Sequence, residues 1–420
     1  MKLKTLILTI ALILGVFTNI SAQPGVVKKA ADAAFTLTTF KADGSILATS
    51  NGVCITTDGI AISPWKPFVG AEKAVIIDAK GQRHEVECLL GANDIYDIVK
   101  FQVTGKTVAA PLATVVAAGE EAWVTPILKS GNAERADVSS VEKFMDKYNY
   151  AILKSSATDK LNGAPVVNSK GQVVGLFNIS GDLQSATDVN YAKDFVLKGL
   201  SQNDVTLRQS GIRIGLPNTT EEAVVALMLS SEKPTNVHEA VVNEFITKFP
   251  QTNDGYYALA NIQIAKGEMA NADKTMQTAI GKVTAKDEAH YNYARLIYRF
   301  AVTHETDEKT KSLGWTLDKA LDEIKKAQST KSNDAYRHLQ AQITFAKGDY
   351  TKAYEEFEAL TKTKFNNPEL YLEMAQSRQH LGANDQEILD LLNKSIEMCD
   401  TPYVSTSAPY FYTRGQQLEK

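Results

Sequence analysis

The 420-residue sequence predicts a multidomain protein in which an all-β half precedes an all-α half. From about residue 34 to residue 199, short runs rich in β-branched residues alternate with turn signals such as Thr57-Asp58-Gly59 and Ser169-Lys170-Gly171. This spacing is typical of an all-β barrel. From Thr219 onward, Ala, Leu, Tyr, Glu and Lys recur with helical spacing and β-branched runs become rare. The change of period predicts two regions of different fold class.

The first residues are predicted to be a targeting segment. Two lysines precede an apolar run from Leu6 to Phe17, and Ser21-Ala22 offers a small-residue cleavage site. The run is shorter than the ~20 residues that a membrane-spanning helix needs. We therefore expect residues 1–22 to be a signal peptide, and the mature chain from Gln23 to be periplasmic or extracellular, without an integral membrane segment. An uncleaved membrane anchor is the alternative.

Composition narrows the chemistry of the first half. Cys54 and Cys88 lie in strand-like runs, where they could pair in an oxidising compartment or serve as small buried hydrophobes. No Cys/His cluster has zinc spacing, and no phosphate-loop or dinucleotide motif occurs, so neither a metal nor another cofactor is expected. The net charge of −4 argues against a nucleic-acid partner.

The clearest predicted strands are Ala34–Thr39, Gly52–Thr56, Ile60–Ser63, Ala74–Ile77, Glu85–Leu90, Ile98–Val103, Pro165–Asn168 and Gln172–Asn178.

Small residues recur in the second half at a period of about 34 residues. The first full member has Ala260, Gly267 and Ala272 at offsets 0, 7 and 12. Small residues at the first and last of these offsets let two antiparallel helices pack closely, and the glycine allows the turn between them. The other members are Ala294, the set Ala341, Gly348 and Ala353, and the pair Ala375 and Gly382.

This pattern resembles the tetratricopeptide repeat, and an unrelated helical bundle that uses Ala for close packing is the alternative. The resemblance implies an all-α solenoid over residues 219–400, with a degenerate first member at Thr219–Pro250 and an inserted polar loop around His304–Ser312. It also implies a concave groove that binds a protein or peptide, and Tyr and Arg are typical hot-spot residues. The residues placed on that face are Tyr257, Asn261, Ile264, Tyr291, Arg295, Tyr298, His338, Gln342 and Phe345.

Four segments of the strand half carry a second resemblance. In order they are 51–63 (NGVCITTDGIAIS), 93–101 (NDIYDIVKF), 162–175 (NGAPVVNSKGQVVG) and 189–192 (VNYA). Together they resemble the double β-barrel of trypsin-like serine proteases, closest to the Deg/HtrA type, over about residues 27–200.

This resemblance implies that the catalytic machinery has been lost. The family needs a Ser nucleophile, a His base and an orienting Asp. The Asp position is kept as Asp97, but the His position falls on Lys66, or on Trp65 in a register shifted by one, and the nucleophile position falls on Asn162. An amide is not a nucleophile, and a Lys with a pKa of ~10.4 is no base at neutral pH. Lys160 stands where the family has a glycine of its oxyanion hole.

We therefore expect a non-catalytic binding or scaffold protein, a pseudoprotease barrel joined to an interaction solenoid. The alternative is an active serine endopeptidase with an unconventional site, in which Ser155 or Ser156 acts with Lys66. His84, the only His of the strand half, is expected on a surface hairpin.

Two further segments complete the predicted organisation. Residues 201–218 are expected to be a linker between the two domains, and residues 401–420 are expected to form a C-terminal tail.

Overall fold

The structure is a computed structural model that describes residues 25–399 except 128, 130 and 304–312. The chain divides into two units, Met1–Val241 and Val242–Lys420. The predicted signal peptide, the predicted inserted loop and the predicted C-terminal tail lie outside the described residues.

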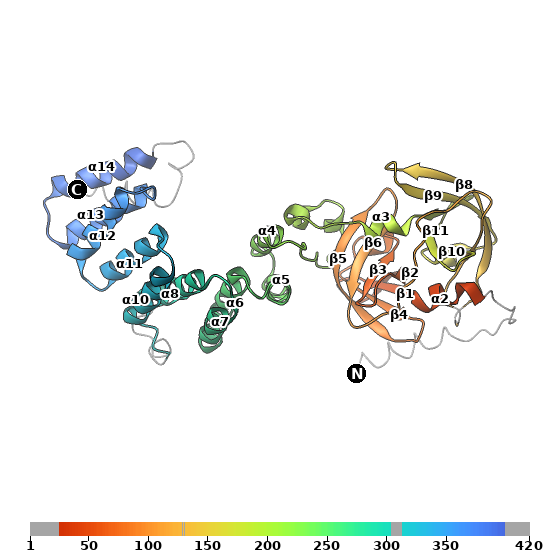
Figure 1. Ribbon diagram of the computed structural model, residues 1–420, viewed down its shortest axis with the longest axis horizontal. Coiled ribbons are helices and arrows are strands. Elements are labelled where there is room, and N and C mark those ends of the chain that lie inside the picture. The colour runs from red at the N-terminus through yellow and green to blue at the C-terminus, as the bar shows by residue number, and fades with distance from the viewer. Residues whose placement is uncertain (1–24, 128, 130, 304–312, 400–420) are drawn as a thin grey trace. The chain divides into compact units, whose positions relative to one another are not determined.

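Six antiparallel strands form a first closed barrel in the order β1-β2-β3-β6-β5-β4 (Figure 1). Alternating burial along β1 and β6 shows why these segments form strands: every second side chain enters the barrel. The strands are β1 (Ala34–Phe40), β2 (Ile46–Cys54), β3 (Ile60–Ser63), β4 (Lys73–Asp78), β5 (Arg83–Asn93) and β6 (Ile98–Val103).

A second closed barrel repeats the strand order of the first, with each strand number raised by six. Its strands are β7 (Glu121–Val124), β8 (Glu134–Phe144), β9 (Tyr148–Ser155), β10 (Pro165–Asn168), β11 (Val173–Ser180) and β12 (Leu183–Thr187). The predicted double barrel is confirmed.

A short helix and an apolar cluster join the two barrels. The cluster combines Val53 and Ile62 of the first barrel with Val167 and Leu176 of the second. Ala30 of helix α2 (Lys28–Ala33), which follows the 3₁₀ turn η1 (Gly25–Val27), packs into it. The loops that both barrels present at this junction are therefore held in fixed positions.

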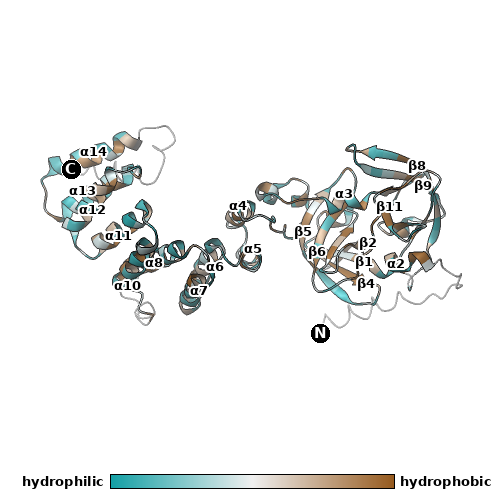
Figure 2. Cartoon of the chain, in the orientation of Figure 1, coloured by the Kyte–Doolittle hydropathy of each residue, from teal (hydrophilic) through white to brown (hydrophobic). Residues whose placement is uncertain are grey.

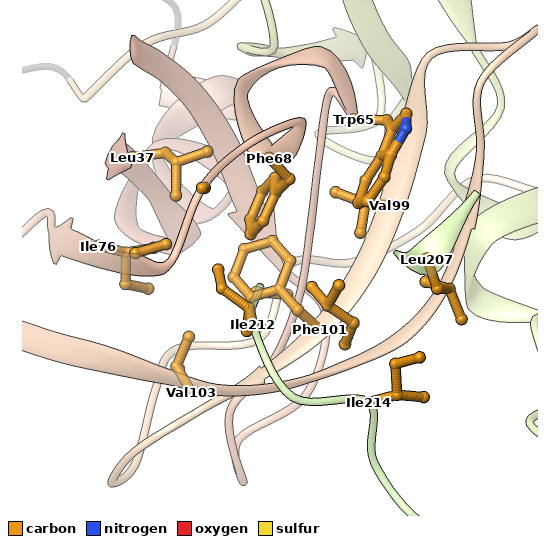
Figure 3. Packing of buried hydrophobic residues seen from close by; sticks show 14 of the residues in the cluster. Leu37, Trp65, Phe68, Ile76, Val99, Phe101, Val103, Leu207, Ile212 and Ile214 are labelled. Atoms are coloured by element: carbon orange, nitrogen blue, oxygen red, sulfur yellow. The ribbon is translucent and has the colours of Figure 1, made fainter. Parts of the chain in front are cut away.

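The segment predicted as a linker packs into the first barrel. Leu207, Ile212 and Ile214 are buried in the same cluster as Phe101 (Figure 3). Ile214 forms a parallel bridge with Leu89, whose N–H donates to the Arg213 carbonyl. Residues 201–218 are thus part of the folded first unit, with the 3₁₀ turns η4 (Gly199–Asn203) and η5 (Leu207–Gln209).

The helical region begins on this segment. Helix α4 (Thr220–Ser230) packs against η4, because Gly199 has no side chain to displace Val225. The following helices are α5 (Thr235–Lys248), α6 (Asn253–Ala265), α7 (Met269–Lys282), α8 (Lys286–Thr303), α10 (Leu317–Thr330), α11 (Asp334–Ala346), α12 (Tyr350–Thr361), α13 (Pro368–His380) and α14 (Asp385–Cys399).

In the second unit successive helices pack in pairs, α6 with α7, α8 with α10, α11 with α12, and α13 with α14. Gly267, Gly348 and Gly382 follow the first helix of three pairs and have φ values of +76°, +86° and +74°. These are left-handed conformations that glycine adopts at no steric cost, so the glycines allow the turns as expected. Hydrophilic and hydrophobic residues are mixed along α7, α8 and α10 (Figure 2). The predicted all-α solenoid is confirmed.

In the part of the chain that the structure describes, no helix combines the length and the apolar character needed to cross a bilayer.

Candidate functional site

Lys66 and Asp97 form an ion pair at the position that the resemblance assigns to a catalytic His and Asp. Asp97 Oδ2 lies 3.6 Å from Lys66 Nζ, and Asp97 Oδ1 accepts a 2.8 Å hydrogen bond from the Lys66 backbone N–H. Asp97 thus caps the 3₁₀ turn η2 (Lys66–Phe68). The Lys66 side chain is 75% exposed, so its ammonium group stays hydrated. The pair fixes the start of the turn, and the Asp97 carboxylate contacts both the backbone N–H and the ammonium group of Lys66.

The shifted register, with Trp65 at the His position, does not fit this geometry. Trp65 is only 1% exposed and stacks on Phe68 inside the first barrel, with ring centroids 6.0 Å apart. Lys66 is the residue of the two that faces Asp97.

Three polar groups of Asn162 have hydrogen-bond partners: its side-chain oxygen, its carbonyl and its backbone N–H. Its side-chain Oδ1 accepts from the Ile179 N–H at 3.0 Å. Its carbonyl accepts from the backbone N–H and the side-chain Nδ2 of Asn51, at 3.1 Å and 3.0 Å. Its own N–H donates to the Asp159 carbonyl at 3.0 Å, which continues the 3₁₀ turn η3 (Asp159–Leu161).

The hydrogen bond from the Asn162 N–H to the Asp159 carbonyl removes a donor that an oxyanion hole would need. In the resembled family the nucleophile's own N–H is one of the donors that stabilise the developing negative charge. Here that donor is used inside the loop, and the neighbouring Lys160 carbonyl accepts from Asn51 Nδ2 at 3.0 Å. The carbonyls of Lys160 and Asn162 thus both accept from Asn51, while the Asn162 N–H donates inside its own loop.

Close packing brings the loops of the two barrels together. Gly163 has φ +81°, and a Cβ added there would lie 2.3 Å from the Asn51 carbonyl oxygen and 2.7 Å from Pro64 Cδ. Pro64 lies two residues before Lys66. The resemblance assigns Lys66, Asp97 and Asn162 to the three catalytic positions, and the structure has these residues in loops that meet between the barrels.

Ser155 and Ser156 have hydrogen-bond partners other than Lys66. Ser155 Oγ donates to Gln184 Oε1 at 2.8 Å, and Ser156 Oγ donates to Glu134 Oε2 at 2.9 Å. Since Lys66 pairs with Asp97, the structure holds no Ser–Lys dyad among these described residues.

The prediction of a surface position for His84 is wrong. His84 is buried, with Nδ1 2.6 Å from the Thr104 carbonyl and Nε2 3.4 Å from Asp78 Oδ2. Both ring nitrogens thus have partners, which is what allows a polar ring to be buried. His84 is a structural residue of strand β5.

Cys54 and Cys88 are buried thiols, with no disulfide between them. Burial raises the pKa of the Cys54 thiol to about 12, so this thiol is a poor nucleophile. Within the described ranges, no group of three or more His, Cys, Asp or Glu side chains is arranged to hold a metal ion.

A hollow of about 340 Å³ lies on the first helices of two repeats, α8 and α11. Tyr291, Arg295, Tyr298 and Gln342, all predicted for the concave face, line it. Four further residues that line the hollow were not predicted. Arg299 and Val302 lie four and seven positions after Arg295, a helical spacing that could have identified them. The missed residues are Arg299, Val302, Thr303 and Leu339.

Helix α6 supports the two arginines of this groove. The Arg295 guanidinium lies over the Tyr257 ring, 5.4 Å from its centroid, and the Arg299 guanidinium donates to Asn261 Oδ1 at 2.7 Å. Tyr257 and Asn261 therefore orient the groove's cations instead of lining the hollow.

His338, also predicted for the concave face, is buried and does not line the hollow. Its Nε2 is 2.6 Å from Glu373 Oε2, and Gln342 Nε2 donates to Glu373 Oε1 at 2.7 Å. Burial lowers the pKa of His338, but the Glu373 carboxylate outweighs burial and raises that pKa above its ordinary value. Burial, with the charges of Glu373 and Glu369, raises the pKa of the Tyr298 hydroxyl to about 12, so Tyr298 remains a hydrogen-bond donor.

The other two residues predicted for the concave face have packing roles. Phe345 packs edge-on against Tyr350, and Ile264 is half-buried against the core between helices.

No protein-family model and no curated protein sequence matches this chain.

Proposed function

We propose that this chain is an exported, non-catalytic binding protein. In this proposal the first unit is a trypsin-like double barrel of the Deg/HtrA type that has lost its chemistry. The second unit is a tetratricopeptide solenoid that binds a protein or peptide through its concave face. Export to the periplasm or extracellular space rests on the predicted signal peptide at residues 1–22.

The loop at Asn162 is the observation that carries the non-catalytic part. Neither side chain at the nucleophile and base positions supports acyl transfer, since Asn162 holds Ile179 and Lys66 holds Asp97. In addition, the Asn162 N–H donates to Asp159, so the backbone donor is used as well. Restoring the side chains alone leaves this third loss in place.

The groove on α8 and α11 supports the binding part. Two tyrosines and two guanidinium groups surround a hollow that Leu339 and Val302 make partly apolar. Aromatic and Arg side chains contribute most of the energy at protein interfaces. Because the cations line the surface while Glu373 is paired with His338 and Gln342, the groove favours segments that carry negative charge.

Fluorophosphonate labelling tests the non-catalytic part. We expect no label on purified Gln23–Lys420, and none on a Lys66→His, Asn162→Ser double variant, because the loop still lacks its donor. A label on the wild type, with the modified Ser identified by mass spectrometry, would overturn the proposal in favour of the active endopeptidase.

A variant pair tests the binding part. Arg295→Ala with Tyr298→Ala should abolish retention of partners found by crosslinking in the native compartment. Arg337→Ala, an arginine of α11 outside the hollow, is the matched control and should retain them. If the groove variant keeps the same partners as the wild type, binding occurs elsewhere.

A further inference from the structure

A second hollow, of about 230 Å³, lies in the first unit, away from the loops of Lys66 and Asn162. One wall is formed by residues of the first barrel and the other by the chain that leaves the second barrel. Eight of its lining residues are aliphatic or aromatic, and two are lysines. The barrel wall consists of Ile55, Thr56, Ile60, Leu90 and Lys100, and the other wall of Lys193, Phe195, Val196, Leu197, Leu216, Pro217 and Asn218.

Gly91 of the first barrel allows the wall that contains Phe195 to pack closely against the barrel. Gly91 pairs with Lys100 across β5 and β6, and a Cβ at Gly91 would lie 2.6 Å from Phe195 Cβ. Only a residue without a side chain lets Phe195 come this close. The Phe195 ring also packs edge-on against Tyr191, with centroids 4.8 Å apart. The hollow is thus bounded by packed structure on both sides.

Lys100 places a cation in this apolar setting. Its ammonium donates to the Lys193 carbonyl at 2.9 Å and to the Phe195 carbonyl. An ammonium has three donors, and in the described part of the chain no third acceptor and no carboxylate lies in bonding range of Lys100. Asp194, whose charge acts on Lys100, hydrogen-bonds to Lys147 and Tyr148 instead.

The lowered pKa of Lys100 is consistent with a partly buried cation that lacks a counter-ion. Burial lowers the pKa of Lys100 to about 8, and the charge of Asp194 offsets this only in part. A cation that has lost solvent without gaining a counter-ion is stabilised by any carboxylate that reaches it.

We propose that this hollow binds a small aliphatic carboxylate, with its chain against the apolar walls and its carboxylate on Lys100 and Lys193. Val196, which is 66% exposed at the rim, offers apolar surface to the same chain. The volume suits a ligand smaller than a typical drug. This site is separate from the proposed groove on α8 and α11 and does not depend on it.

Isothermal titration of the chain from Gln23 onward with hexanoate tests the proposal. Hexan-1-ol, which has the same chain without the charge, is the control ligand. We expect saturable hexanoate binding with a dissociation constant on the order of 1 mM or lower, and hexanol binding at least about 10-fold weaker. Absent binding of hexanoate, or equal binding of hexanol, would overturn the proposal.

Two variants locate the site. Lys100→Met should weaken hexanoate binding at least about 10-fold. Lys73→Met, an exposed lysine of the same barrel, should leave it unchanged. Val196→Asp supplies an internal carboxylate at an exposed position, so it should fold normally and block binding. Hexanoate affinity that survives in a folded Lys100→Met or Val196→Asp protein contradicts the assignment.

The natural carboxylate could be a free acid or the end of a peptide chain. Acetyl-Ala-Ala-Leu with a free carboxylate, compared with its amide, separates these sources. Binding of hexanoate alone identifies a free acid, and binding of the free-ended peptide but not of its amide identifies a peptide terminus.

Discussion

At the scale of single residues, the loop beside Asn162 depends on one glycine. Gly163 combines a left-handed φ of +81° with contact distances to Asn51 and Pro64 that no side chain can satisfy. The same residue therefore keeps the loops of both barrels in contact.

Replacing Gly163 with Ala should cost at least about 2 kcal/mol in the free energy of unfolding, from the φ strain and the displaced backbone together. Gly44→Ala is a matched control, because Gly44 has the same φ of +81° with open space around it. That control should cost about 1 kcal/mol, from strain alone. Urea unfolding followed by circular dichroism measures both, and equal losses would show that the contacts do not matter.

Lys100 makes stability depend on pH. Its folded pKa is about 8 and its ordinary value is 10.5, so below pH 8 both states are protonated and the cost of burying the charge is fully present. Between pH 8 and 10.5 the unfolded chain binds more protons, so the free energy of unfolding rises with pH at this site.

Lys100→Met should remove this rise. Urea unfolding at pH 7.5 and 9.5 should show a larger gain in stability on going to pH 9.5 for the wild type than for Lys100→Met. Lys73→Met should follow the wild type. Parallel behaviour of wild type and Lys100→Met would mean that Lys100 titrates normally.

At the scale of elements, one carboxylate joins three parts of the helical unit. Asp273 of α7 accepts from the Tyr293 hydroxyl of α8, from Trp315 Nε1 at 2.7 Å, and from Lys319 Nζ of α10 at 3.4 Å. Burial alone would raise the pKa of Asp273, but these donors outweigh it and lower that pKa. Its stabilisation is therefore present above an ordinary Asp pKa of 3.8 and is lost as the pH falls below it.

Asp273→Ala should destabilise the helical unit by about 3 kcal/mol, because it leaves buried donors without an acceptor. Asp273→Asn keeps one acceptor oxygen and should cost less. Thermal unfolding followed by the circular dichroism of the helices measures both variants at pH 7. A neutral Ala variant would mean that water replaces the carboxylate.

The elements also show what the sequence could predict. The strands at β1 and β6, and the glycines after α6, α11 and α13, follow from local rules and were predicted. Strand β8 escaped prediction because Glu134–Phe144 carries many polar residues on its solvent face. At the candidate site, the sequence was enough to predict that Lys66 and Asn162 replace the catalytic residue types. The Asn162–Asp159 hydrogen bond was not, because it depends on the local backbone conformation.

The positions of His84 and of residues 201–218 escaped prediction for a different reason. Both are decided by long-range packing: His84 meets the Thr104 carbonyl, and Ile214 meets Leu89. A single sequence carries no local signal for such pairings.

At the scale of the whole molecule, the first barrel depends on chain that follows the second. Leu207, Ile212 and Ile214 complete its core, and Gly211 N–H donates to the Ala71 carbonyl at 2.8 Å. The boundary suggested by the change in sequence pattern, near residue 200, therefore cuts through a core.

A fragment ending at residue 200 should be much less stable than one ending at residue 218. In the full chain, Ile214→Ala should cost about 3 kcal/mol by opening a cavity. Val205→Ala, at an 82% exposed position of the same segment, should change stability little. Limited proteolysis and urea unfolding compare them, and equal stability of the two fragments would show that the segment is dispensable.

This dependence sets an order of events during folding. Ile214 follows every strand of both barrels in the sequence, so the N-terminal barrel cannot complete its core until that later segment is available. The second barrel has all of its strands available before the first has its full core. Pairings between residues far apart in the sequence form slowly, and so the N-terminal barrel is expected to be the last part of its unit to mature and the part most exposed to chaperones.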